Sequence, residues 1–385
     1  MRTTRLFLTT AAIAALALIA GCGGSPEATS PKGSGGSSAP AGAELAGLYK
    51  GTLKAPDGTP RPAAKGKKVV IISAGQASIS SSLPSNAALA AAKAIGWEAT
   101  IYDAQLNPAN VPGLIDQAIS SGADGIVLDA SDCPTGKGPL ETAKAKGVKV
   151  VGLYSFDCND PQFGGKDKPL FSGSINYGAV AASDPGRFTQ SYAAGQAKAV
   201  IAATGGKAKV IVFNDPEFTI LKYTAKGFID EIKACAGCKI VAQVDFTGKE
   251  LGPTLQQKAA SVLLQHPEAN AVKSPFTTAT VLGIAPAVVQ SGRADKVFVM
   301  GGEGFSPELD LMRNGQGVNA VMTAPSDWTG WAAVDTLNSV FLGKAPAESG
   351  LGWQLVDRTH NLPASGAYRS PVDYQTVYKK AWGVG

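Results

Sequence analysis

Residues 96–132 read GWEATIYDAQLNPANVPGLIDQAISSGADGIVLDASD, and this stretch decides the fold. An apolar run, EATIYDA, is followed by a helical pattern, NVPGLIDQAISSG, and then by a second apolar run, ADGIVLDA. Two strands that flank one helix favour a β-α-β unit with parallel strands and a right-handed crossover. The rhythm extends to both sides, with KKVVIIS at 67–73 and VKVVGLYS at 148–155. Residues 67–172 therefore predict one α/β lobe with a parallel sheet.

A second series of strands and helices follows a polar, glycine-rich crossing segment at residues 156–176. Its apolar runs are AKVIVFND (208–215), KIVAQVDF (239–246), NAVKSPF (270–276), KVFVMGG (296–302) and GVNAVMTAP (317–325). A late strand, WQLVDRTH (353–360), and a terminal helix, DYQTVYKKAW (373–382), follow. We therefore expect a second lobe over 173–324, completed by about 351–385, while about 325–350 returns to the first lobe.

The amino end has the pattern of an export signal. Arg2 and Arg5 precede a short apolar stretch at 6–20, which is too short for a stable membrane span. Residues 19–22, Ile-Ala-Gly-Cys, resemble a bacterial lipobox, which implies cleavage after residue 21 and a diacylglycerol on Cys22 that anchors the chain to the membrane. An ordinary signal peptide with an incidental cysteine is the alternative. Residues 22–66 are expected to form a flexible tether, since 23–43 hold almost no large apolar side chain. The later stretch LAGLYKGTLKAPDGTPRP (45–62) is expected to dock loosely.

Composition and charge exclude several classes of protein. A hydrophobic content of 44% excludes disorder of the whole chain. The net charge of +5 is confined to the amino end, because residues 1–68 hold nine basic and three acidic side chains and the remainder holds 26 basic and 27 acidic. The folded part is therefore nearly neutral, and a nucleic-acid partner is not expected.

The chain resembles a type I periplasmic substrate-binding protein of the ribose/galactose kind that serves an ABC importer. The segments that carry the resemblance are KKVVIIS, residues 96–132, GVKVVGLYS, QHPEANAV and KVFVMGGEGFSP, in that order and spacing. The resemblance implies two Rossmann-like lobes joined by a three-strand hinge. It also implies a small polar, sugar-like ligand in the cleft and a permease that accepts the closed form. We expect a monomer.

Ligand-binding residues are expected just past the strand ends, because parallel sheets place their loops and pockets there. Carboxylates there would hydrogen-bond sugar hydroxyls, and aromatic rings would stack on the sugar. The collected candidates are Gln76, Ser78, Ile79, Ser80, Asp129, Asp132, Tyr154, Ser155, Asp215, Phe218, Tyr223, Thr224, Phe246, Phe276, Thr277, Glu303, Asp327 and Trp328. Asp129, Asp132 and Asp327 have an alternative role as helix caps, and Phe246 and Trp328 an alternative role in the core. We expect Trp328→Ala and Glu303→Ala to abolish stabilisation by ligand without changing the melting temperature of the free protein.

Three positions depart from the pattern of sugar-binding relatives. Such relatives commonly place Asp-Arg where this chain has Tyr154-Ser155, and Arg at the start of the helix that holds Thr224. Glu303 stands where Asp is expected. A charged bidentate clamp is therefore absent at two places, and a less hydroxylated or partly aromatic ligand becomes plausible.

Cysteine spacing predicts two disulfides, and no enzyme or cofactor site is expected. Cys133 and Cys158 follow neighbouring strands, whereas Cys235 and Cys238 close a helix, so a redox or zinc role for this second pair is the less favoured alternative. The chain has two histidines and lacks GxSxG, Walker and GxGxxG motifs. The rival functions are a receptor that feeds a kinase or chemoreceptor, an anchored hydrolase, and a repressor, which would need an N-terminal helix-turn-helix.

Overall fold

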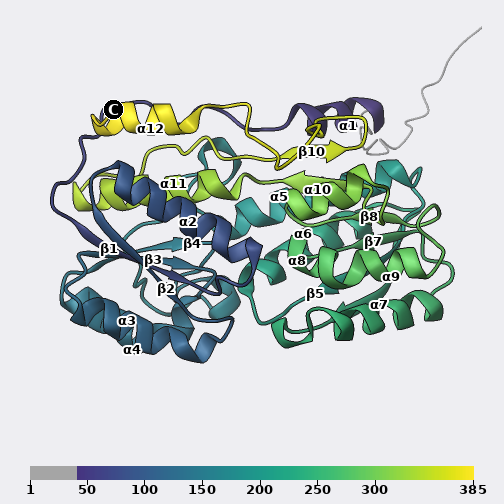
Figure 1. Ribbon diagram of the computed structural model, residues 1–385, viewed down its shortest axis with the longest axis horizontal. Helices are drawn as coiled ribbons and strands as arrows, with labels where there is room; N and C mark the ends of the chain where they lie inside the picture. The colour runs from purple at the N-terminus through teal and green to yellow at the C-terminus, as the bar shows by residue number, and fades with distance from the viewer. Residues whose placement is uncertain (1–40) are drawn as a thin grey trace, which may run out of the picture. The chain divides into compact units, whose positions relative to one another are not determined.

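The first sheet is built from the apolar runs that the sequence marks as buried strands. In the computed structural model, which describes residues 41–385, its four parallel strands lie in the order β2-β1-β3-β4 (Figure 1). The elements of this lobe are β1 (Lys68–Ser73), α2 (Ile79–Ala94), β2 (Glu98–Asp103), α3 (Val111–Ser120), β3 (Gly125–Asp129), α4 (Lys137–Ala145), β4 (Lys149–Leu153) and, from later in the chain, α11 (Ser326–Phe341).

Both faces of this sheet are covered by helices. Successive residues of a strand point to opposite faces. Val69 and Ile71 therefore pack with residues of α2 and α11, whereas Val70 and Ile72 pack with residues of α3 and α4. Burial on both faces explains why β1 reads as a continuous apolar run.

The second sheet has six strands in the order β10-β9-β8-β7-β5-β6, of which β10 alone is antiparallel to its neighbour. The elements of this lobe are α5 (Pro185–Ala203), β5 (Lys209–Asn214), α6 (Thr219–Ala234), β6 (Lys239–Asp245), α7 (Pro253–Gln265), β7 (Ala271–Lys273), α8 (Thr277–Ala279), α9 (Ala285–Gln290), β8 (Phe298–Met300), α10 (Ser306–Arg313), β9 (Ala320–Thr323) and β10 (Gln354–Asp357). The predicted fold class, two α/β lobes with parallel sheets, is confirmed.

Three segments connect the two lobes. Residues 173–184 lead from β4 to α5, residues 324–325 lead from β9 to α11, and residues 343–353 lead from α11 to β10. The first and third segments lie side by side, because Asn176 bridges to Glu348 and the Ser349 N–H donates to the Asn176 carbonyl at 2.8 Å. These are the connections expected of the hinge.

The extent of the predicted tether needs correction. Helix α1 (Ala41–Lys50) packs on α5 and β10, and Leu45 and Leu48 contact the main hydrophobic core. The backbone N–H groups of Thr52, Lys54 and Asp57 then donate to carbonyls of the third connection at 2.8–3.0 Å. Residues 41–66 are therefore folded onto the lobes, because apolar side chains such as Leu45, Leu48 and Leu53 pack against the core. The predicted signal peptide, Cys22 and the start of the tether lie outside the described residues.

The carboxyl end also departs from the predicted domain boundaries. Helix α12 (Tyr374–Trp382) packs on α11 of the first lobe and not on the second lobe. Its aromatic side chains stack on those of α11, with ring centroids 4.9 Å apart for Trp328 and Tyr374 and 5.5 Å apart for Trp331 and Trp382. Within 351–385, β10 belongs to the second sheet as expected, whereas α12 belongs with the first lobe.

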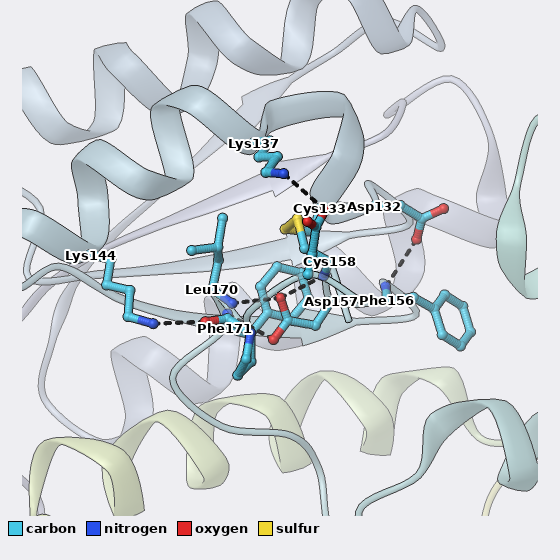
Figure 2. Close-up of a disulfide and its surroundings, with 11 residues drawn as sticks. Asp132, Cys133, Lys137, Lys144, Phe156, Asp157, Cys158, Leu170 and Phe171 are labelled. Carbon is cyan, nitrogen blue, oxygen red and sulfur yellow. Dashed lines mark hydrogen bonds and ion pairs between the residues drawn. A yellow bond between two sulfur atoms is a disulfide. The ribbon is translucent and has the colours of Figure 1, made fainter. Parts of the chain in front are cut away.

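The polar crossing segment after β4 is held by a disulfide and a half-buried carboxylate (Figure 2). Cys133 and Cys158 are disulfide-bonded, with Cα atoms 5.0 Å apart. The Asp157 carboxylate next to them accepts the backbone N–H groups of Cys158, Leu170 and Phe171 at 2.7–3.0 Å. Because Asp157 satisfies these donors, the segment can turn without strand pairing.

A second disulfide joins Cys235 and Cys238 at the end of α6. Their Cα atoms lie 5.3 Å apart, within the usual range for a disulfide. Within residues 41–385, no helix combines the length and the apolar character that a membrane span requires.

Candidate functional site

A pocket of about 150 Å³ lies between the two lobes. It is formed where strands of both sheets end, the place where open parallel sheets bind ligands. The first lobe contributes Ala74, Ser78, Ser80, Ser81, Leu106, Pro108, Ala130, Tyr154 and Phe156 to its wall. The second lobe contributes Pro185, Phe188, Thr189, Tyr192, Asp215, Glu217, Phe218, Ile220, Leu221, Thr224, Gly248, Leu251, Pro275, Phe276 and Glu303. Tyr177, Ala324 and Ser326 come from or adjoin the connections.

Eight of the side chains that the sequence analysis collected meet on this wall. They come from both lobes although they are distant in the sequence, and they are Ser78, Ser80, Tyr154, Asp215, Phe218, Thr224, Phe276 and Glu303. Their common feature is a position after a strand or in the first two turns of the next helix, so the topology brings them together.

Two serines on the first-lobe wall differ in their hydrogen bonding. The Ser78 and Thr278 hydroxyls lie 3.2 Å apart, which links the loop before α2 to α8 of the other lobe. The Ser80 hydroxyl oxygen is buried and has no hydrogen-bond partner among the described residues. A buried hydroxyl without a partner is costly, so Ser80 is a candidate for a ligand contact.

Three wall residues of the first lobe have left-handed backbone conformations. Leu106, Ala130 and Tyr154 follow β2, β3 and β4 and have φ values of 56°, 46° and 57°. Such conformations are unfavourable for residues other than glycine and tend to occur at functional sites. Here they turn the chain sharply where it passes the pocket. The Tyr154 hydroxyl lies 3.0 Å from Ser326 Oγ and 3.1 Å from Thr329 Oγ1, which fixes the ring, and burial raises the pKa of this phenol.

The second-lobe wall carries carboxylates in a buried environment. Glu303 accepts the backbone N–H of Thr277 at 2.6 Å, and burial raises the pKa of the Glu303 carboxyl. Asp215 is fully buried, and its Oδ1 accepts the N–H of Glu217 at 3.1 Å. Its Oδ2 has no partner among the described residues. Burial raises the pKa of Asp215 to about 7, with the neighbouring acids as a further cause.

Five first-lobe candidates do not reach the wall, and one of them, Ile79, is the first residue of α2. Asp129 lies beneath the wall, where its Oδ2 accepts the hydroxyls of Ser81 and Ser85 and burial raises its pKa to about 7. Asp132 accepts the N–H of Phe156 at 3.0 Å and shapes the loop after β3. The last two candidates are Gln76, which donates to Ser73, and Ser155, which donates to the Leu128 carbonyl.

The other candidates lie in the core, at a contact between lobes or under α12. Phe246 packs against Phe276 inside the second lobe, and Thr277 donates to the buried Glu308. Tyr223 donates to Asp160 at 2.6 Å, between α6 and the crossing segment. The remaining two belong to α11, where Asp327 accepts the Tyr374 hydroxyl at 2.7 Å and Trp328 is fully buried against α12. The expectation that Trp328 and Phe246 stack on a ligand is therefore corrected, because other elements cover both rings.

The sequence analysis missed most of the aromatic wall. Phe156 and Tyr177 come from the crossing segment and the first connection, and Phe188 and Tyr192 come from α5. The last two are four residues apart and so share one face of that helix. Two aromatic residues four positions apart, in the first helix after the crossing segment, are the sequence signal that predicts this part of the wall.

One cluster of potential metal ligands occurs in the part of the chain that the structure describes. Cys133, Asp157 and Cys158 bring three potential ligand atoms within 4.8 Å of one another, but the disulfide removes both thiolates. His266 contacts Glu268 and His360 contacts Asp357, and neither histidine lies on the pocket wall.

Residues 69–345 match the family model described as "Periplasmic binding protein domain", and the chain belongs to this family. A comparison with curated proteins finds no match. The match ends before β10 and within the third connection, but it includes every residue of the pocket wall. Proteins of this family and the solved structures with the same fold are binding proteins and not enzymes.

Solved structures share the fold at low sequence identity. GanP, a glucose-galactose binding protein from Geobacillus stearothermophilus, is 19% identical with a TM-score of 0.63, over 77% of this chain and 99% of that one. An ABC transporter solute-binding protein from Agrobacterium vitis, bound with α-D-tagatopyranose, is 19% identical with a TM-score of 0.64, over 76% and 95%. The 5-methylthioribose transporter solute-binding protein from Thermotoga lettingae, in complex with 5-methylthioribose, is 17% identical with a TM-score of 0.62, over 83% and 94%.

Proposed function

We propose that the protein is a monomeric extracytoplasmic receptor that captures a small solute and delivers it to an ABC importer. The observation that carries the proposal is the pocket between the lobes, whose wall is contributed by both of them. A ligand that contacts both lobes stabilises the arrangement in which they meet, so capture and closure are coupled. The sugar-binding proteins with the same fold support this function.

Two contacts between the lobes provide the means of closure. The Ser78 and Thr278 hydroxyls meet at 3.2 Å, and the Tyr223 hydroxyl donates to Asp160 at 2.6 Å. The Tyr223 ring also lies 4.9 Å from that of Phe156, which lies on the pocket wall. A ligand that orders Phe156 therefore also favours the contact made by Tyr223.

Binding is expected to close the lobes of the purified protein. Residues 41–385 should be titrated with galactose, tagatose, 5-methylthioribose, myo-inositol, choline and 2-phenylethylamine. At least one compound should raise the Tm and decrease the radius of gyration in X-ray scattering at monomeric mass, because closure makes the chain more compact. A compound that is chemically converted, or one that binds without compaction, would contradict the receptor function.

Export and lipid anchoring complete the proposed function. The Ile-Ala-Gly-Cys pattern at 19–22 supports a lipid on Cys22, which would hold the receptor near a permease and raise its local concentration. An oxidising compartment would also keep both cysteine pairs as disulfides.

Mass spectrometry of the full chain, extracted from membranes of the producing bacterium, tests both expectations. The mature protein should begin at Cys22 and carry the mass of a diacylglycerol there. After denaturation and alkylation without reductant, Cys133, Cys158, Cys235 and Cys238 should remain unlabelled. A Cys22→Ser variant, which should appear in the soluble fraction, is the control. A chain that begins elsewhere would contradict anchoring, and labelled cysteines would contradict the disulfides.

A further inference from the structure

The pocket carries acidic groups and lacks basic ones. Asp215, Glu217 and Glu303 all lie on its wall, whereas no lysine, arginine or histidine does. The wall also lacks asparagine and glutamine, so its side-chain hydrogen-bond donors are hydroxyl groups. An anionic ligand would face carboxylates without a compensating charge, and this class of solute is disfavoured.

The carboxylate of Asp215 offers the pocket a hydrogen-bond acceptor that no described residue engages. The residue is fully buried, and Oδ2 has no hydrogen-bond partner among the described residues. An unpaired buried carboxylate is unfavourable, and a ligand that donates to it or carries a positive charge relieves the cost. Asp215 directly follows β5 and Phe218 precedes α6 three residues later, so one short loop contributes both a carboxylate and an aromatic ring to the wall.

Seven aromatic rings line the same pocket. They are Tyr154, Phe156, Tyr177, Phe188, Tyr192, Phe218 and Phe276. Aromatic faces bind apolar groups and attract cations, and together with carboxylates they are typical of sites for substituted ammonium groups. The wall has no amide or guanidinium group to pair with the hydroxyls of a monosaccharide, so only its carboxylates and hydroxyls can do so, whereas a cation also gains from the negative charge.

The basic residue that bears most directly on this charge balance is Lys273. It lies in β7, is 1% exposed and does not belong to the wall. Burial lowers its pKa to about 7, and the charge of Glu303 acts in the opposite direction. Even with a charged Lys273 offsetting Glu303, Asp215 and Glu217 leave the pocket negative.

We propose that the ligand is an organic cation with an apolar body, a protonated amine or a quaternary ammonium compound, whose charge is held by Asp215 and whose body packs on the aromatic wall. This inference rests on the proposed receptor function and names its solute class.

Matched probes separate charge from shape. Choline and 3,3-dimethylbutan-1-ol have nearly the same shape, and 2-phenylethylamine and 2-phenylethanol form a second pair. Calorimetric titration of residues 41–385 at pH 8 should show each cation binding at least tenfold more tightly than its neutral partner. Equal affinities within a pair would overturn the proposal.

Asp215→Asn should weaken binding of the cations at least tenfold and leave binding of the neutral partners within twofold. Asp116→Asn is the matched control, because Asp116 is an exposed carboxylate of helix α3 in the first lobe and lies outside the wall. It removes the same charge without a pocket contact and should change the affinity for the cations less than threefold. An equal loss in both variants would mean that the overall field acts, and would overturn the role of Asp215.

The pH dependence gives an independent readout. Burial raises the pKa of Asp215 to about 7, and the groups whose charges act on it are the acids Glu217, Asp245 and Glu250, the last of which pairs with Lys258. Below that pH the carboxyl is protonated and cannot neutralise a cation. The affinity for choline should therefore rise between pH 5.5 and pH 8, and this rise should be smaller in Asp215→Asn. A flat profile in the unaltered protein would contradict the assignment.

The test distinguishes failure of this inference from failure of the receptor function. Stabilisation and compaction by sugars or polyols alone would overturn the cation assignment and leave the receptor function standing. If neither the sugars nor the cations stabilise the protein, both proposals fail.

Discussion

Trp328→Ala should lower the free energy of unfolding of the ligand-free protein by about 3–5 kcal/mol, the usual cost of truncating a fully buried tryptophan. The indole is 0% exposed, stacks on Tyr374 at 4.9 Å and has its Nε1 3.3 Å from the Tyr378 hydroxyl. Its removal opens a cavity between α11 and α12 and leaves the Tyr378 hydroxyl without this partner. Urea unfolding followed by circular dichroism measures the loss.

This result would reverse the expectation drawn from the sequence, that Trp328→Ala removes binding and spares stability. Phe218→Ala is the matched comparison, because Phe218 is a partly exposed aromatic residue on the pocket wall. It should cost clearly less stability than Trp328→Ala but weaken every ligand that raises the Tm. An unchanged urea midpoint in Trp328→Ala would show that α12 does not cover the tryptophan in solution.

Asp335→Ala should also destabilise the protein by about 3–5 kcal/mol, because it leaves a buried cation without its partner. Arg61 and Asp335 form an ion pair at 3.2 Å with both side chains 5% exposed. Asp335 also accepts the Trp382 indole N–H at 2.7 Å, so two donors lose their acceptor. Burial raises the pKa of Asp335, and the Arg61 charge opposes that shift.

A double variant tests the physical cause of this loss. Arg61→Met with Asp335→Leu removes both charges and should recover most of the stability lost in Asp335→Ala, since replacing a whole buried pair by apolar groups is often close to neutral. Asp167→Ala, which breaks the exposed pair of Lys137 and Asp167, should change stability much less. If the double variant is as unstable as the single one, the loss comes from packing and not from the unpaired charge.

The fold was predictable because a strand whose two faces are both buried has apolar side chains along its whole length, as β1 does. The wall was predictable in part, because parallel strands end at one edge and bring Ser78, Phe218 and Glu303 together. The position of Trp328 was not, since nothing local to α11 shows that α12 packs on it. Leu106 and Ala130 were missed for a related reason. Their backbone conformation brings them to the pocket, and their residue types do not reveal it.

Residues 41–66 hold the amino end of the described chain against both lobes. Helix α1 rests on the second lobe, and after the stretch beside the third connection Arg61 and Ala63 donate backbone N–H groups to Ala381 and Trp382 of α12 on the first lobe. Residues 41–66 thus contact both lobes, and under the anchoring proposed for Cys22 the tether would reach the protein through a segment that holds on to each of them.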